Sequence, residues 1–141
     1  ARPVFDLWDH EVWLEAPSAL AGLQGRADRI RTRLRTLLEQ LRHDRRRVAG
    51  YGAAAKATTL LNWCDIGPDL GQYMIDLTPT KHGRYMPGTA IPIISPSADS
   101  RAPDVYLLTI HNYLTDVLRR EQAFTNGGGR WLVPIPNPVL L

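Results

Sequence analysis

The feature that most constrains this chain is a glycine-rich turn between an apolar strand and an alanine-rich helix. Gly50-x-Gly52-x-x-Ala55, followed by Lys56, satisfies the pattern G-x-G-x-x-G/A. Its glycines allow a tight turn and a close backbone approach to a pyrophosphate. The N–H groups and the dipole of the following helix favour an anion at that end, and Lys56 would add a cation. The same pattern also suits a plain strand-to-helix turn without a ligand. Ala57, which stands where Ser or Thr would hold magnesium, excludes a Walker A loop.

Composition indicates one soluble domain. The chain has 141 residues, of which 44% are hydrophobic and 22% charged, which is ordinary for a globular protein. The single cysteine, Cys64, excludes a disulfide framework within the chain and a multi-cysteine zinc site. Neither a signal peptide nor a run of 18 apolar residues occurs, so we expect a cytoplasmic protein without a membrane partner. Because the chain opens with Ala1 rather than Met, we expect it to be a piece of a longer protein.

Arginines crowd into the segment before the glycine turn, where apolar residues recur at the spacing of one helix face. The spacing predicts an amphipathic helix over residues 26–44, with its arginines mainly on a solvated face or on a face that meets another domain. No aromatic residues interleave the arginines, so a nucleic-acid partner is not expected. Pro17, Gly22 and Gly25 suggest that residues 1–25 form an arm or linker. The apolar positions are Ile30, Leu34, Leu37, Leu38 and Leu41.

Strand and helix patterns alternate after the glycine turn, which predicts an α/β fold with a doubly wound, mostly parallel, five-stranded sheet in the order 3-2-1-4-5. Flanking helices should cover both faces. The connection over residues 78–89 is too rich in Pro and Gly to be helical. The further strands are predicted at 73–76, 91–94, 105–110 and 131–135, and helices at 53–63 and 113–124.

Polar residues follow three of these strands, and the carboxyl ends of parallel strands share one edge, where ligands of such sheets bind. The first strand ends at Gly50–Gly52, the second at Asp76 and the fourth at His111. Asp76 could bind a ribose hydroxyl or simply cap a turn. His111 could act as an acid or base, but no nucleophile or paired carboxylate lies beside it in sequence. We therefore assign no catalytic residue.

Four blocks of residues occur in an order that resembles one known domain: the C-terminal domain of the S-adenosylmethionine-dependent C-methyltransferases that modify nucleotide-linked deoxysugars. The resemblance covers about residues 48 to 136. The blocks are Val48 to Lys56 continuing into Thr59-Leu60-Leu61-Asn62; Asp76-x-x-Pro79-x-Lys81-x-Gly83-Arg84-Tyr85-x-Pro87-Gly88-Thr89-x-Ile91-Pro92-Ile93; Asn112-Tyr113; and Gly128-Gly129-Arg130 with Val133-Pro134-Ile135-Pro136.

The resemblance implies a Rossmann-like domain, at residues 26–141, that binds substrate and packs on other domains. In that family an N-terminal domain binds zinc, and a middle domain binds S-adenosylmethionine and carries the catalytic residues. The middle and C-terminal domains together hold the dTDP-sugar. We therefore expect no cofactor, no metal site and no methyl transfer in the isolated chain. The residues expected on the substrate side are Gly50, Tyr51, Gly52, Ala53, Ala54, Lys56, Asn62, Asp76, Lys81, Arg84, Tyr85, His111, Asn112 and Tyr113.

Two alternatives stay open. A stand-alone domain could use the glycine turn and Asp76 to bind NAD(P) or another nucleotide, and a purely structural domain could leave the crevice empty. The loop after Asp76 is also open to two interpretations. Arg84 could meet a phosphate while Tyr85 packs on a base or sugar ring, or the loop could wrap the edge of the sheet.

Overall fold

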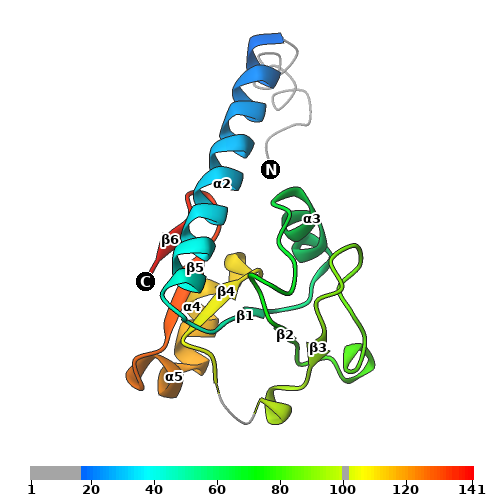
Figure 1. Ribbon diagram of the computed structural model, residues 1–141, viewed down its shortest axis with the longest axis vertical. Coiled ribbons are helices and arrows are strands. Elements are labelled where there is room, and N and C mark those ends of the chain that lie inside the picture. The colour runs from blue at the N-terminus through cyan, green and yellow to red at the C-terminus, as the bar shows by residue number, and fades with distance from the viewer. Residues whose placement is uncertain (1–16, 100–101) are drawn as a thin grey trace, which may run out of the picture.

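The computed structural model describes residues 17–99 and 102–141, which form a six-stranded sheet between two layers of helices (Figure 1). The strand order is β3-β2-β1-β4-β5-β6. All neighbours are parallel except β5 and β6, which are antiparallel. The predicted α/β class and the order 3-2-1-4-5 are confirmed. The strands are β1 (Val48–Tyr51), β2 (Met74–Ile75), β3 (Ile93–Ile94), β4 (Val105–Leu108), β5 (Arg130–Val133) and β6 (Val139–Leu140).

The prediction of five strands was wrong because it missed β6. This strand has two residues and follows a turn at Ile135–Pro138, in which the Ile135–Pro136 peptide is cis. A two-residue strand is too short to show an alternating pattern, and the prolines just before it indicate a loop rather than a strand. The predicted order puts the strand expected at 91–94 at an edge of the sheet, and β3 (Ile93–Ile94) does end the sheet.

Helices α2 and α3 lie on one face of the sheet, and α4 and α5 lie on the other (Figure 1). The helix predicted over 113–124 is divided into a 3₁₀ turn, η4, and the two short helices α4 and α5. The helical elements are α2 (Pro17–His43), α3 (Ala55–Trp63), η2 (Pro79–Lys81), η3 (Pro96–Ala98), η4 (His111–Tyr113), α4 (Leu114–Arg120) and α5 (Gln122–Asn126). Within the described ranges, no helix is long and apolar enough to cross a membrane.

Side chains of the strands alternate between two apolar clusters, one on each face. In β4, Val105 and Leu107 join the cluster that contains residues of α2 and α3. Tyr106 and Leu108 join the cluster that contains residues of α4 and α5. All four side chains are buried, as the continuous apolar run predicted. Both faces of the sheet are therefore covered by helices, and the edge formed by the carboxyl ends of the strands is where a ligand-binding site can form.

Helix α2 begins at Pro17, so the prediction that Pro17, Gly22 and Gly25 prevent a long helix was wrong. Proline is favourable in the first turn of a helix, where its missing N–H needs no partner. Each glycine in an exposed helix costs about 1 kcal/mol relative to alanine, which a helix of this length tolerates. Residues 17–25 of the predicted arm thus belong to α2, and residues 1–16 lie outside the described part of the chain.

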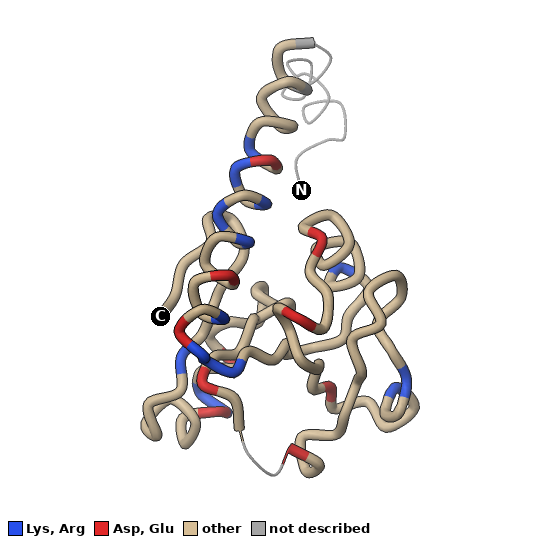
Figure 2. Tube along the Cα trace, in the orientation of Figure 1, with Lys and Arg blue, Asp and Glu red and all other residues tan. Residues whose placement is uncertain are grey.

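The second half of α2 packs on the sheet, whereas its first half projects from the body (Figure 1). Leu34 and Leu38 are fully buried, and Leu37 and Leu41 pack against the same cluster. Ile30, which was expected to pack with them, instead lies in the projecting half and lines a groove with Ile135. Six arginines lie along this helix, against one aspartate and one glutamate (Figure 2).

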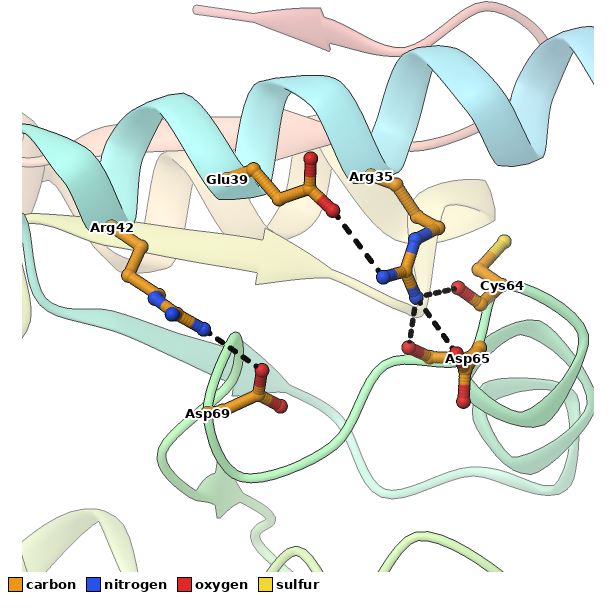
Figure 3. Close-up of polar contacts among 6 residues, drawn as sticks. All are labelled: Arg35, Glu39, Arg42, Cys64, Asp65 and Asp69. Carbon is orange, nitrogen blue, oxygen red and sulfur yellow. Dashed lines mark hydrogen bonds and ion pairs between the residues drawn. The ribbon is translucent and has the colours of Figure 1, made fainter.

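Some arginines of α2 hold the helical layer together rather than facing only solvent (Figure 3). Arg35 Nη1 donates to the carbonyl oxygen of Cys64 at 3.1 Å and lies 3.1 Å from a carboxylate oxygen of Asp65. Arg42 pairs with Asp69 at 3.0 Å. The last carbonyls of a helix lack intrahelical partners and favour a cation, so Arg35 caps the end of α3.

Candidate functional site

A pocket of about 240 Å³ opens at the carboxyl ends of β1 and β2. Ligands of open α/β sheets bind at this edge, where the strand order reverses. Its lining is mostly apolar, and its charged members are Asp76, Lys81 and Arg120. The residues that line it are Tyr51, Gly52, Ala54, Ile75, Asp76, Leu77, Lys81, Pro96, Ile110 and Arg120.

The glycine turn shapes this pocket because two of its positions exclude a side chain. Gly52 has φ +95°, and a Cβ there would come within 2.7 Å of Ile110. Gly50 lies on β1, and a Cβ there would come within 1.9 Å of the Met74 sulfur. Gly50 therefore serves packing within the sheet, whereas Gly52 turns the backbone into the pocket and towards the start of α3.

Asp76 anchors the turn through both of its carboxylate oxygens. Oδ2 accepts hydrogen bonds from the backbone N–H of Ala53 at 2.8 Å and from Lys81 Nζ at 3.0 Å. Oδ1 accepts one from the backbone N–H of Thr78 at 2.8 Å. Lys81 also donates to the carbonyl of Ala53 at 2.9 Å. Burial alone would raise the pKa of Asp76, but the hydrogen bonds from Thr78 and Lys81 outweigh it and hold the pKa below its ordinary value.

A second cation lies where α3 begins, next to η4. Lys56 Nζ donates to the side-chain oxygen of Asn112 and lies 5.8 Å from the centre of the Tyr113 ring. These three predicted residues are therefore together at the carboxyl edge. His111 precedes them, and its buried Nδ1 has no partner in the described residues. Burial, followed by the nearby charge of Lys56, lowers the pKa of His111, so its imidazole is neutral at pH 7.

The pocket also contains a group that the sequence did not indicate, Arg120 at the end of α4. Arg120 Nη2 donates to the Tyr51 hydroxyl, which donates to Glu121 Oε1 at 2.6 Å. Arg120 Nε donates to the same Glu121 oxygen at 3.2 Å. Burial and the bond to Glu121 raise the pKa of Tyr51 to about 12, against the opposing effect of Arg120, so the hydroxyl keeps its proton. Nothing in the sequence distinguishes Arg120 from the exposed Arg119.

Nine of the fourteen residues predicted on the substrate side do not line this pocket: Gly50, Ala53, Lys56, Asn62, Arg84, Tyr85, His111, Asn112 and Tyr113. Asn62 Nδ2 donates to the carbonyl of Pro87 at 2.9 Å and so ties the loop after Lys81 to α3. Arg84 and Tyr85 lie beside β3 and line a separate groove at the sheet edge. Met86 is the buried anchor of this loop. The loop therefore wraps the edge, as in the second interpretation, and a ligand contact of Arg84 or Tyr85 stays a prediction.

Within the described ranges, no group of three or more His, Cys, Asp or Glu side chains is arranged to hold a metal ion.

Comparison with known proteins identifies the family of this chain. Residues 7–136 match the family described as the C-methyltransferase C-terminal domain. A curated relative, C-methyltransferase NovU from Streptomyces niveus, is 40% identical over 115 residues. The match covers 81% of this chain and 27% of the relative, so the chain spans little of that protein's length. The chain belongs to the C-methyltransferase C-terminal domain family.

Proposed function

We propose that the pocket at the carboxyl edge binds a nucleotide-linked deoxysugar of the dTDP type. In this proposal the domain presents the sugar to a methyltransferase domain of a longer protein, and it transfers no methyl group by itself. The family membership supports the methyltransferase context, and the residues of the pocket support the class of ligand.

The observation that carries the proposal is that cations and the start of α3 lie in or beside one largely apolar pocket. The chain has two lysines, of which Lys81 lines the pocket and Lys56 lies beside it, at the carboxyl edge. At the start of α3 the N–H groups of Ala54 and Ala57 bond to the carbonyls of Gly52 and Ala54, which leaves those of Ala55 and Lys56 without a backbone partner among the described residues. Free N–H groups at a helix start favour a phosphate. Ile75, Leu77 and Ile110 supply apolar walls against which a base or sugar ring can pack.

The pocket is smaller than the range of about 300–1,000 Å³ that is usual for sites that enclose a ligand. Its volume of about 240 Å³ suits part of a nucleotide sugar. This supports a shared site in which another domain covers the rest of the substrate. We propose that this other domain binds S-adenosylmethionine, and that a further domain binds zinc.

The NAD-binding alternative depends on Asp76 as the acid that binds ribose hydroxyls. Both carboxylate oxygens of Asp76 already accept hydrogen bonds, from Ala53, Thr78 and Lys81. Releasing the carboxylate for a ribose would leave the buried N–H of Ala53 without its partner and would remove one of the two contacts of Lys81. This cost disfavours a dinucleotide relative to a ligand bound through phosphate and apolar contacts.

Calorimetry of the chain with dTDP, dTDP-glucose and NAD tests the proposal. We expect the two dTDP compounds to bind more tightly than NAD, and Lys56→Gln to weaken dTDP binding by roughly threefold to tenfold, the loss of one partly exposed phosphate contact. Arg29→Gln, which removes the same charge from an exposed site on α2, is the matched control. Tighter binding of NAD, or equal effects of Lys56→Gln and Arg29→Gln, would contradict the proposal.

A further inference from the structure

We propose that Arg120 is an oxyanion-binding residue of this pocket, and that Tyr51 and Glu121 position it. The inference rests on the proposed function and deepens it, since the anion is then a phosphoryl group of the nucleotide-linked sugar. Neither the glycine-turn pattern nor the resemblance assigns a role to Arg120.

The guanidinium of Arg120 is fixed along one edge. Nε and Nη2 form one edge of the planar group, and these two nitrogens donate to Glu121 Oε1 and to the Tyr51 hydroxyl. The guanidinium carbon also lies 5.7 Å from the centre of the Tyr51 ring. Tyr51 is 5% exposed, so its ring is held by the core and is a rigid support. A hydroxyl that accepts from Arg120 and donates to Glu121 orders all three groups.

The opposite edge of the guanidinium is left open. Arginine carries five N–H donors in a fixed fork, and the two contacts above use one donor of Nε and one of Nη2. Nη1 has no hydrogen-bond partner among the described residues, and Arg120 lines the pocket. The Nη1–Nη2 edge therefore presents two parallel donors, the geometry that binds a phosphoryl group through two oxygens. The side chain of Arg120 is 48% exposed, so a ligand in the pocket can reach it.

The neighbouring Arg119 provides a matched control. Its side chain is 74% exposed and its carboxylate partner, Asp116, lies 3.9 Å away. Arg119→Gln and Arg120→Gln remove the same charge one residue apart. Arg120→Lys keeps the charge but removes the fork. Comparing the three separates a specific two-oxygen contact from general attraction of an anion.

The test is calorimetry of dTDP and thymidine with the wild-type chain and the variants Arg120→Gln, Arg120→Lys, Arg119→Gln and Tyr51→Phe, each first checked for an unchanged circular dichroism spectrum. We expect both Arg120 variants to weaken dTDP binding by about tenfold, and Arg119→Gln by less than twofold. Tyr51→Phe should weaken dTDP binding severalfold without changing thymidine binding, a difference that a purely structural role of the hydroxyl would not produce.

Two results would overturn the assignment. One is equal dTDP affinity of wild type and Arg120→Gln, and the other is full recovery of affinity in Arg120→Lys, which would mean that charge alone matters. Either result leaves the proposed function standing if the wild-type chain binds dTDP. Failure of the wild-type chain to bind dTDP would refute the proposed function itself, and with it the role of Arg120.

Discussion

Replacing Asp76 with alanine should destabilise the domain far more than replacing Asp69, although both carboxylates lie 3.0 Å from a cation. The side chain of Asp76 is 9% exposed, whereas that of Asp69 is 62% exposed. An exposed ion pair contributes about 0–1 kcal/mol, since water screens it and ordering the side chains costs entropy. Asp69→Ala should therefore lower the free energy of unfolding by no more than about 1 kcal/mol.

The cost of Asp76→Ala comes from the three donors that it leaves behind. The N–H of Ala53 stays buried without a partner, which costs about 1.5–3 kcal/mol for a bond to a charged acceptor. Thr78 is exposed and Lys81 is partly exposed, so water can partly replace their contacts, at about 0.5–1.5 kcal/mol each. Together these terms predict a loss of about 2.5–6 kcal/mol, which brackets the range of about 3–5 kcal/mol found when one partner of a buried ion pair is removed.

Urea denaturation followed by circular dichroism measures both variants. The pKa of Asp76 is lowered in the folded state, so its stabilisation is present above the ordinary pKa of an aspartate, about 3.9, and is lost as the pH falls through the folded-state pKa. The deficit of Asp76→Ala relative to wild type should therefore be full at pH 7 and should shrink at pH values below about 4. A difference between Asp76→Ala and Asp69→Ala below about 1 kcal/mol at pH 7 would refute this account of the anchor.

Gly52→Ala should lower the free energy of unfolding by about 2–4 kcal/mol, because it combines left-handed backbone strain with a contact to Ile110. Gly128→Ala, at φ +88° with no atom within 4 Å of its Cβ, should lower it by about 1–2 kcal/mol. Equal losses of the two variants in thermal or urea unfolding would contradict the contact with Ile110. Arg35→Met should lower the free energy of unfolding by about 1–2 kcal/mol through loss of the cap on α3, measured by urea denaturation, and an unchanged midpoint would rule out the cap. Cys64 is buried, and burial raises the pKa of its thiol. Labelling by a thiol reagent at pH 8 should therefore be slow in the native chain and fast in urea. Rapid labelling of the native chain would contradict this and show that α3 opens readily.

The sheet could be predicted from the sequence because its central strands carry strong local signals. The run Val105–Leu108 is apolar at every position, which is typical of a strand buried on both faces, and the glycine turn fixes where β1 ends. The true start of α2 could not be predicted, since the small cost of each glycine is offset by the many bonds of a long helix. Strand β6 could not be predicted because it has no sequence pattern of its own and forms only where the chain returns beside β5.

The sequence allowed the location of the pocket to be predicted, but not the hydrogen bonds within it. Lys81 and Asp76 follow β2, so topology alone brings them to the carboxyl edge. That Asp76 holds the N–H of Ala53 depends on a distance of 2.8 Å across 23 positions of sequence, which no local pattern encodes. Arg120 reaches the pocket because α4 packs beneath β1, so its role follows from packing.

The most direct test of a substrate pocket at the carboxyl edge is a titration of the ¹⁵N-labelled chain with dTDP, followed by nuclear magnetic resonance. A ligand in the pocket should shift the backbone amides of Gly52, Ala54 and Lys81, and leave those of Arg29 and Arg33, which line a separate groove on α2, nearly unchanged. Shifts confined to Arg29 and Arg33, or no shifts at millimolar dTDP, would contradict the account.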